Sequence, residues 1–483
     1  MENRVLRYKG QTPIAPTREA YDHLLRAVNT RYSSRPDKVY PLSLEGFLNC
    51  YTGRRRTRYE QAVSDLRLAP LTREDARVST FIKNEKFNYL AKRDGTDPRA
   101  IQPRKPKYLA AVGTWFKPLE HIMYQDLAQR LYGDEALPCI AKGLNAQQTG
   151  FVLRQKWDRF TDPVCVSLDA SRFDLHVSVD ALKFTHKLYH KYCQSRELQK
   201  YLRWTLSNSG VASCSETAYK YEVQGRRMSG DMDTALGNCI LMVCLTWHML
   251  TTMNVRHELL DNGDDCLFIC NAADVPTDEQ ITDFYRQFGF VVKLEGRTSM
   301  FERIEFCQTQ PVLTATGWRM IRQLPSIAKD LTNVNMAQKS QSEYTAWLKA
   351  VGLCGRTLND GVPIFHAFHN MLVRLGTDSR IHRSVFYECG LVNLVKGMRY
   401  EQQPVTHESR LSFHRAFGVD PAMQLAVEEY YGSVQGPLGK SILHEWPIQL
   451  KEEYDSGAEW FVLGGGPRES LQGGEPLGSL SQQ

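Results

Sequence analysis

Acidic residues fall at two places in this sequence where a turn follows an apolar run. Asp169 closes the run 164–168, and Asp264 and Asp265 lie in a turn between two further apolar segments. A carboxylate at the end of a buried strand is costly unless it meets a cation. Converging carboxylates select a hard divalent ion such as Mg²⁺ or Mn²⁺. Two such ions about 3.5–4 Å apart can activate an attacking oxygen and stabilise a leaving one, as in nucleotidyl transfer.

A second set of polar residues accompanies these carboxylates. Asp174 follows closely after Asp169, and a loop containing Ser229 and Gly230 leads into an apolar segment that begins at Thr234 and includes Asn238. Each feature alone has an ordinary explanation. A Gly-Asp-Asp sequence is most often only a turn, and Asn238 alone would be a buried amide satisfied within its helix. The joint occurrence in one chain favours a site.

The apolar pattern predicts the elements that must position these residues. Helices are predicted over 114–131, 179–193, 196–206, 234–253 and 278–288, and strands over 164–168, 219–226 and 290–294. One predicted hairpin joins 256–260 to 266–270 across Asp264 and Asp265. Another joins 305–309 to 312–321 and turns at Thr316-Gly317. Residues 326–453 have a mostly helical pattern, and the Gly-, Ser- and Gln-rich segment 455–483 is predicted to be disordered.

Composition and charge narrow the class of protein. The 483 residues are 42% hydrophobic and 24% charged, which is typical of a globular chain. Twelve cysteines without a CxxC pair disfavour a zinc ribbon or a disulfide scaffold. Residues 1–110 hold 23 Lys and Arg against 12 Asp and Glu, whereas the whole chain holds 60 against 54. This basic N-terminal part favours a polyanionic partner, although a solvated charged surface is the commoner explanation of any single cluster.

Six sequence motifs, taken together, resemble one family. They are SLDASRFDLHVS (167–178), RMSGDMDTALGN (227–238) and GDD (263–265), with FIKNEK (81–86) and DPRAIQPR (97–104) upstream and IEFCQTQP (304–311) downstream. The set resembles the RNA-dependent RNA polymerases of tombusvirus-like positive-strand RNA viruses. The resemblance covers roughly residues 80–325 in detail.

The resemblance implies an α/β fold, with an α+β palm, in a right-hand polymerase of fingers, palm and thumb. An antiparallel palm sheet would be flanked by helices, and the thumb would be mostly helical. The implied division is 1–160 for the N-terminal and fingers region with a basic channel, 161–325 for the palm with a fingers insertion near 180–228, 326–454 for the thumb, and 455–483 for a tail.

The resemblance also implies roles for individual residues. Asp169, Asp264 and Asp265 would hold two Mg²⁺ ions, with Mn²⁺ as a possible substitute, and Lys293 would protonate the leaving pyrophosphate. Asp174 and Asn238 would recognise the ribose 2′-hydroxyl, which both donates and accepts, with Ser229, Gly230 and Thr234 beside them. Lys83, Lys86, Arg99 and Arg104 would guide the triphosphate and the template. An ordinary surface lysine on a strand is the competing interpretation of Lys293, and a solvated basic loop that of the last four.

The implied function is replication of a positive-strand viral RNA genome from NTPs, on an RNA template and nascent strand, with de novo initiation. No transmembrane segment is evident, so a membrane-anchoring viral replicase protein and host factors are expected as partners, in the host cytoplasm at membrane-associated replication complexes. A longer translation product that carries the anchor is the alternative. Two residues depart from the family pattern. Asp233 replaces a more usual Asn and Leu175 a more usual Gln. An acid at 233 would weaken triphosphate binding if it faced the site, or it could cap the helix start.

Three other functions compete with this one. A two-metal nuclease would use the carboxylates but would not need the Ser229-Gly230 loop with Asn238 at its spacing. Reverse transcriptase is disfavoured by the Asn262-Gly263-Asp264-Asp265 turn and by the ribose pair. A non-catalytic RNA-binding scaffold is favoured equally by the basic N-terminal part, but it would have no reason to keep all three carboxylates.

Overall fold

The computed structural model describes residues 2–83, 99–214, 217–331, 340–378 and 391–435. The chain divides into two compact units, Met1–Pro311 and Val312–Gln483. The four-part division predicted from the sequence stays a prediction, and the segment 455–483 lies outside the described residues.

The central sheet of the first unit has four antiparallel strands in the order β6-β7-β3-β8. They are β6 (Glu258–Asp261), β7 (Asp265–Asn271), β3 (Pro163–Ala170) and β8 (Val292–Thr298). Apolar runs explain the two inner strands, β7 and β3, because the middle of each is buried on both faces. A bulge interrupts the pairing of β3 with β8 between Ser167 and Leu168.

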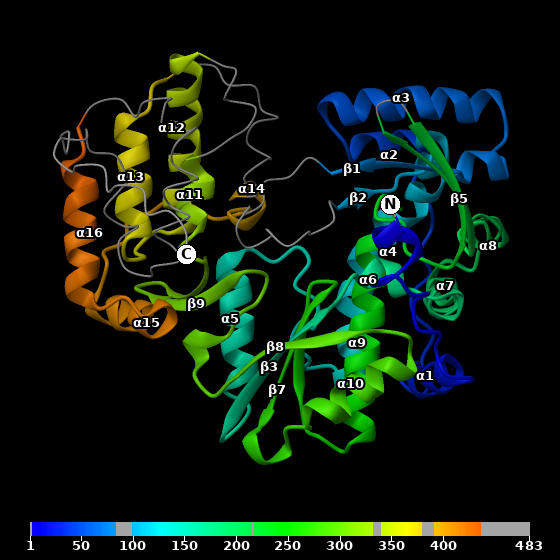
Figure 1. Ribbon diagram of the computed structural model, residues 1–483, viewed down its shortest axis with the longest axis horizontal. Helices are drawn as coiled ribbons and strands as arrows, with labels where there is room; N and C mark the ends of the chain where they lie inside the picture. The colour runs from blue at the N-terminus through cyan, green and yellow to red at the C-terminus, as the bar shows by residue number, and fades with distance from the viewer. Residues whose placement is uncertain (1, 84–98, 215–216, 332–339, 379–390, 436–483) are drawn as a thin grey trace, which may run out of the picture. The chain divides into compact units, whose positions relative to one another are not determined.

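Helix α9 (Thr234–Thr252) supports this sheet and contacts β6 and β7. Figure 1 shows α9 and α10 (Asp278–Gln287) beside the strands β3, β7 and β8. Residues 236–247 of α9 are all buried, as expected of a helix that is apolar on every side. This helix is long and apolar enough to cross a membrane, but it forms the core of the unit, with 78% of its most apolar window buried.

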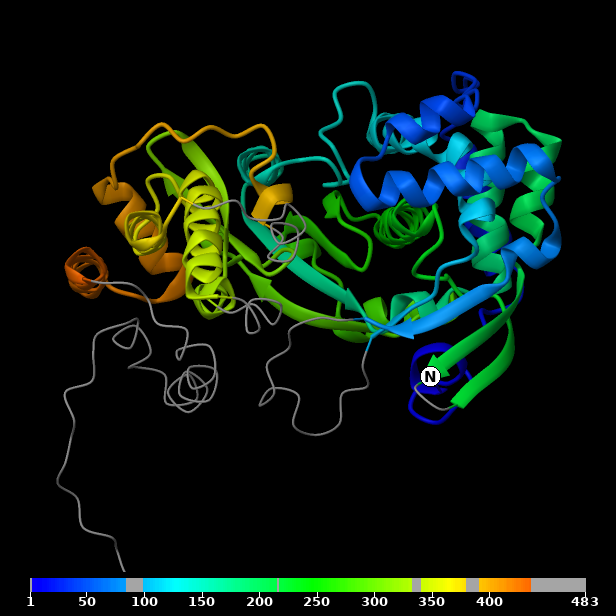
Figure 2. The same ribbon diagram turned by 90° about the horizontal axis from the view of Figure 1, so that it is seen from above.

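A second four-stranded sheet has the order β2-β1-β4-β5. Its strands are β1 (Val78–Ile82), β2 (Ala100–Ile101), β4 (Ser207–Cys214) and β5 (Thr217–Gln224). β1 runs parallel to β4, and the other pairs are antiparallel. Figure 2 shows the long β4–β5 ribbon. The pairing of β1 with β4 joins segments far apart in the sequence, and β2 continues directly toward Arg104.

The remaining helices of the first unit surround the two sheets. Their bounds are α1 (Ala20–Asn29), α2 (Leu44–Asn49), α3 (Gly53–Leu68), α4 (Pro106–Tyr132), α5 (Ala146–Trp157), α6 (Phe173–His176), α7 (Val179–Cys193) and α8 (Arg196–Arg203), with short helical turns η1 (Glu2–Leu6), η2 (Arg73–Ala76), η3 (Ala272–Asp274) and η4 (Phe301–Arg303). None of the ten cysteines described forms a disulfide.

The second unit is mostly helical. It contains α11 (Ser326–Leu331), α12 (Gln341–Leu358), α13 (Phe365–Leu375), α14 (Leu391–Leu394), α15 (His407–Phe417) and α16 (Pro421–Ser433). The hairpin of β9 (Thr309–Thr314) and β10 (Gly317–Arg322) begins at the end of the first unit and continues into the second. A buried ion pair joins Arg322 to Asp330, and His369 donates from Nε2 to the same carboxylate at 3.1 Å.

The structure confirms a mixed α/β fold with an antiparallel central sheet. It also confirms the predicted hairpin at the Asp264-Asp265 turn and helix 179–193, which is α7 residue for residue. The predicted strand 305–309 is wrong. Cys307 and Gln308 have positive φ values of 53° and 59°, so Phe306 and Thr309 close a tight turn and β9 begins only at Thr309. The predicted helix 114–131 begins earlier, at Pro106, because proline is favourable in a first helical turn.

Candidate active site

The antiparallel register of the central sheet brings the predicted acidic residues together. Asp169 near the end of β3 is the direct partner of Asp265 at the start of β7. The intervening turn needs Gly263, whose φ of +109° is in a region that other residues rarely adopt. Asp169 and Asp264 both line one cavity of about 590 Å³. Asp265 is not among the lining residues.

The electrostatics of these carboxylates show an excess of negative charge. Burial raises the pKa of Asp169, and the neighbouring charge of Asp264 raises it further, while Lys293 acts in the opposite direction. The pKa of Asp265 is raised by burial and by the same neighbour. Glu295 on β8 responds similarly to burial and to Asp169. Such a group favours a bound cation, since like charges at close range disfavour simultaneous ionisation.

Lys293 is the direct partner of Asp169 on the other side of β3. It is exposed and is not among the residues that line the cavity. The structure therefore places the backbone of Lys293 beside that of Asp169, but its side chain is not part of the cavity lining. Its role as a general acid stays a prediction.

The two residues predicted to recognise a ribose lie together in the cavity wall. Asn238 Nδ2 donates to Asp174 Oδ1 at 2.8 Å. The amide oxygen of Asn238, Oδ1, is buried and has no hydrogen-bond partner among the described residues. Burial raises the pKa of Asp174 to about 6, against the opposing effect of this hydrogen bond. The pair thus presents one unused acceptor and one shared carboxylate, which suits a hydroxyl group.

The loop that contains Ser229 and Gly230 is held by its own residues and by β2. Thr234 Oγ1 donates to the carbonyls of Met228 at 2.8 Å and Asp231 at 3.0 Å, which closes the loop at the start of α9. Ser229 and Thr234 line the cavity, whereas Gly230 lies behind it against Pro103.

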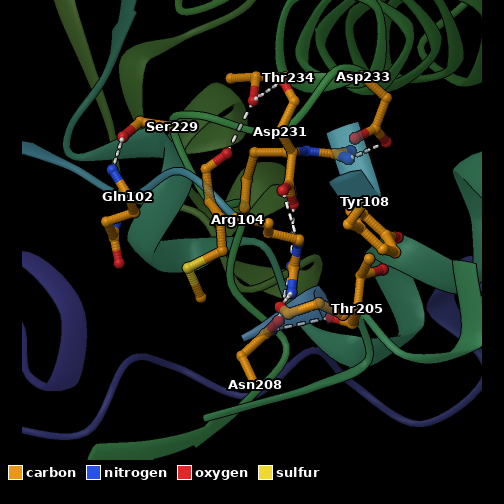
Figure 3. A network of polar contacts seen from close by, with 12 residues as sticks. Gln102, Arg104, Tyr108, Thr205, Asn208, Ser229, Asp231, Asp233 and Thr234 are labelled. Atoms are coloured by element: carbon orange, nitrogen blue, oxygen red, sulfur yellow. Dashed lines mark hydrogen bonds and ion pairs between the residues drawn. The ribbon is translucent and has the colours of Figure 1, made fainter. Parts of the chain in front are cut away.

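The predicted basic residues separate into two groups. Lys83 and Arg99 line the cavity, and Lys86 lies outside the described residues. Arg104 is only 2% exposed and does not line the cavity. Its three side-chain nitrogens bond to Asp231, to the carbonyl of Ala76 and to Asn208 (Figure 3). In this arrangement the guanidinium of Arg104 does not face the cavity.

Asp233, the unusual acid in the family pattern, neither faces the cavity nor caps its helix through its side chain. It forms a buried ion pair with Arg227 and accepts a hydrogen bond from Tyr189 at 3.2 Å. The charge at this position is therefore neutralised inside the unit.

Sequence reasoning missed several residues of the cavity wall. Arg4, Lys142 and Arg172 add positive charge, and Gln102 and Asn262 add polar groups. Arg172 could have been noticed from the sequence, because it lies within the motif 167–178. In the structure it adopts a positive φ of 49°. Arg4 and Lys142 carry no local signal, because they reach the cavity only through the folding of distant segments.

The fold and the cavity together define a class of protein. It is a mixed α/β chain in which an acidic turn, a hydrogen-bonded Asp–Asn pair and several basic side chains line one cavity. Comparison with known sequences gives the family. A family model described as viral RNA dependent RNA polymerase matches residues 1–437. This chain belongs to that family, which confirms the resemblance.

Curated relatives agree with this assignment. The chain is 43% identical over 434 residues to the RNA-directed RNA polymerase of groundnut rosette virus, covering 89% of this chain and 50% of the relative. It is 39% identical over 411 residues to that of tobacco necrosis virus strain A, covering 83% and 55%. For melon necrotic spot virus the values are 39% over 393 residues, covering 80% and 49%. The chain thus spans about half the length of these relatives.

Proposed function

We propose that this chain is an RNA-directed RNA polymerase that replicates a positive-strand viral RNA genome. The observation that carries the proposal is the register of β3 with β7, which brings Asp169 and the Asp264-Asp265 turn to the cavity that also contains Asp174 and Asn238. The substrates would be NTPs, an RNA template and a nascent strand. We propose an N-terminal and fingers region over 1–160, a palm over 161–325 with a fingers insertion near 180–228, and a helical thumb over 326–454.

Divalent ions fit the acidic residues of the cavity. The described residues contain no group of three or more His, Cys, Asp and Glu side chains placed to hold a metal by themselves. Mg²⁺ commonly binds through one or two carboxylates together with substrate phosphates and water, so Asp169 and Asp264 supply a suitable donor set, with Asp265 adjacent. When bound, two Mg²⁺ ions, or Mn²⁺ in their place, would neutralise the triphosphate and lower the pKa of the attacking hydroxyl.

The chain's own side chains would perform the remaining tasks. Asp174 and Asn238 would hold the ribose 2′-hydroxyl, and Lys83 and Arg99 would attract the triphosphate toward the acidic end of the cavity. Lys293 would supply a proton to the leaving pyrophosphate. Because Lys293 does not line the cavity, this step would need a water relay or a change of rotamer.

We also propose that initiation needs no primer, and that a membrane-anchoring viral replicase protein and host factors bring the chain to membrane-associated replication complexes in the host cytoplasm. Flotation of the chain with vesicles, with and without such a partner, tests this anchoring.

Primer extension on a defined RNA template with Mg²⁺ tests the catalytic proposal. Asp264→Ala should lower NTP incorporation by at least about 100-fold, because it removes a charged group that acts on the reacting atoms. RNA binding should be nearly unchanged. Asp274→Ala, beyond the opposite end of β7 and exposed, is the matched control and should retain activity. Equal synthesis by Asp264→Ala and the parent would contradict the proposal, and Mg²⁺-dependent shortening of RNA without NTPs would favour a nuclease.

A further inference from the structure

The loop 229–231, called the cavity loop below, contacts β2 and the segment that follows it. Each of its three residues makes a different contact. The first is Ser229, whose hydroxyl is used twice. It donates to the carbonyl of Ala100 at 3.1 Å and accepts from the backbone N–H of Gln102 at 3.2 Å. A side chain thus substitutes for a neighbouring strand at this edge of β2.

The second residue, Gly230, allows a close backbone approach. A Cβ atom at this position would lie 2.5 Å from the Cα of Pro103, which is closer than real Cβ atoms come to backbone. Glycine is therefore required here by contact with the opposite segment.

The third residue, Asp231, completes the docking through charge. Its carboxylate accepts from Nε of Arg104 at 2.6 Å and from Nη2 at 3.0 Å (Figure 3). The two side chains are 1% and 7% exposed. Nη1 of Arg104 also donates to the carbonyl of Ala76 at 2.6 Å, and Nη2 to Asn208 at 2.7 Å. Arg104 therefore joins the cavity loop to the second sheet.

We propose that Arg104 is a positioning residue, which acts on the nucleotide through Asp231 and the loop 229–231. This inference rests on the proposed polymerase function. Arg99 stands before the docked segment and lines the cavity, while Thr234 and Asn238 follow the loop and line its opposite wall. The Arg104–Asp231 pair sets the distance between the group that attracts phosphate and the group that recognises the ribose.

A double-mutant cycle separates positioning from direct phosphate contact. Arg104→Gln and Asp231→Asn should each raise the NTP KM by about tenfold, as expected for the loss of a charged hydrogen bond. The double variant should be no worse than either single variant, because the two residues act as one unit. Arg104→Lys should restore part of the loss, since it keeps the charge but not the two-nitrogen geometry. An impaired Arg104→Gln enzyme with a normal Asp231→Asn enzyme would overturn the proposal in favour of phosphate contact.

A structural readout makes the test independent of activity. Release of the loop should expose Arg226 and Arg227, so trypsin should cleave there several-fold faster in Arg104→Gln and Asp231→Asn than in the parent. Lys156→Met is the matched control, because Lys156 forms an equally buried ion pair with Glu258 away from the cavity. It should lower the unfolding temperature without changing the NTP KM or this cleavage. An equal KM change in the control would reduce Arg104 to a merely structural role.

The two proposals fail in different ways. If the parent chain does not extend RNA but the cleavage cycle behaves as expected, the polymerase proposal fails and the docking of the loop stands. If the parent extends RNA and neither KM nor cleavage changes in Arg104→Gln and Asp231→Asn, the positioning proposal alone is overturned.

Discussion

At the scale of single residues, the cavity joins groups whose charges would otherwise be costly. Burial raises the pKa of Asp174 to about 6, and the hydrogen bond from Asn238 acts in the opposite direction. The amide oxygen of Asn238 is a buried acceptor without a donor, and an unsatisfied buried acceptor costs about 1–3 kcal/mol. A substrate hydroxyl would satisfy it. This pair is therefore where selection of the sugar should be decided.

Asn238→Ala is expected to lower the preference for an NTP over its 2′-deoxy analogue by about 10-fold or more, because the hydroxyl loses its acceptor. Incorporation of the two nucleotides by the same enzyme on one template measures the ratio. Thr246→Val, further along α9 and buried, serves as a control for helix stability and should leave the ratio unchanged. An unaltered ratio in Asn238→Ala would remove this residue from sugar recognition.

The sequence was enough to single out Asp169, Asp264, Asp174 and Asn238, which the structure brings to one cavity, because each stands in a distinctive local pattern. Their roles stay predictions. Arg104 shows why prediction from the sequence failed elsewhere. Its basic, proline-rich surroundings are the same whether it faces phosphate or a carboxylate. The deciding partner, Asp231, lies far along the chain, and only the folded contact reveals it. The surroundings of Asp233 could not be predicted either. Its partner Arg227 is close in the sequence, but the burial of the two side chains depends on the whole fold.

At the scale of elements, the sheet and its turns set the geometry of the acidic group. The sequence predicted β3, α7 and the hairpin of β6 and β7 well, since long apolar runs and turn residues are local signals. It did not predict β1, β2 and β4. These strands are short or contain several Ser, Asn and Gly residues, and their stability comes from pairing with remote segments.

Gly263→Ala should lower polymerase activity by about 100-fold or more, because strain at a φ of +109° would shift the turn that holds Asp264. Space is not the limit, since the nearest side-chain atom to an added Cβ is 3.9 Å away. Gly317→Ala is a closely matched control: its φ is +108° in the hairpin of β9 and β10. Both variants should lose similar unfolding free energy, and only Gly263→Ala should lose activity. Equal loss of activity in both would contradict this.

The ion pair of the second unit gives a prediction about pH. Arg322, whose charge lies beside the buried Asp330 carboxylate, helps to hold its pKa at about 2, below the usual value of 3.8, despite the opposing effect of burial. A depressed carboxyl pKa stabilises the folded state above pH 3.8, and this stabilisation is lost as the pH falls toward 2.

Asp330→Asn should therefore lower the free energy of unfolding by about 3–5 kcal/mol at neutral pH, as for a broken buried ion pair. The difference from the parent should shrink between about pH 4 and pH 2. Denaturant unfolding at several pH values, followed by a probe in the second unit, measures this. A difference that is independent of pH would mean that Asp330 contributes through packing alone.

At the scale of the whole molecule, the basic N-terminal part and the cations of the cavity form one electrostatic feature of the first unit. Arg4, Lys83, Arg99, Lys142 and Arg172 come from five separate segments, yet they line the same cavity. The sequence predicted a polyanionic partner from the excess of basic residues in 1–110, which includes Arg4, Lys83 and Arg99 but not Lys142 or Arg172. It could not predict their meeting point, because that depends on the complete fold.

RNA affinity should consequently fall steeply with salt, with a log–log slope of roughly −0.7 for each phosphate neutralised on a single strand. Lys142→Ala should make the slope less steep by about 0.7 if this lysine contacts one phosphate. Fluorescence anisotropy of a labelled RNA at several salt concentrations measures both slopes. Lys183→Ala on the exposed side of α7 is the control and should leave the slope unchanged. An affinity that does not respond to salt would show that these cations are ordinary solvated surface.

The bulge in the central sheet has a consequence for changes in chain length. Ser167 pairs with Gly296 and Leu168 with Leu294, so Glu295 is the extra residue of β8. Deleting Glu295 would leave the partners on both sides as they are, including Lys293 opposite Asp169. Deleting Leu294 would remove the bulge as well, but it would put Glu295 opposite the buried Leu168. A deletion further along the strand would shift the pairs between it and the bulge by one residue and turn their side chains to the other face. Insertions and deletions among related chains should accordingly be tolerated at this one point of the strand and rejected on either side of it.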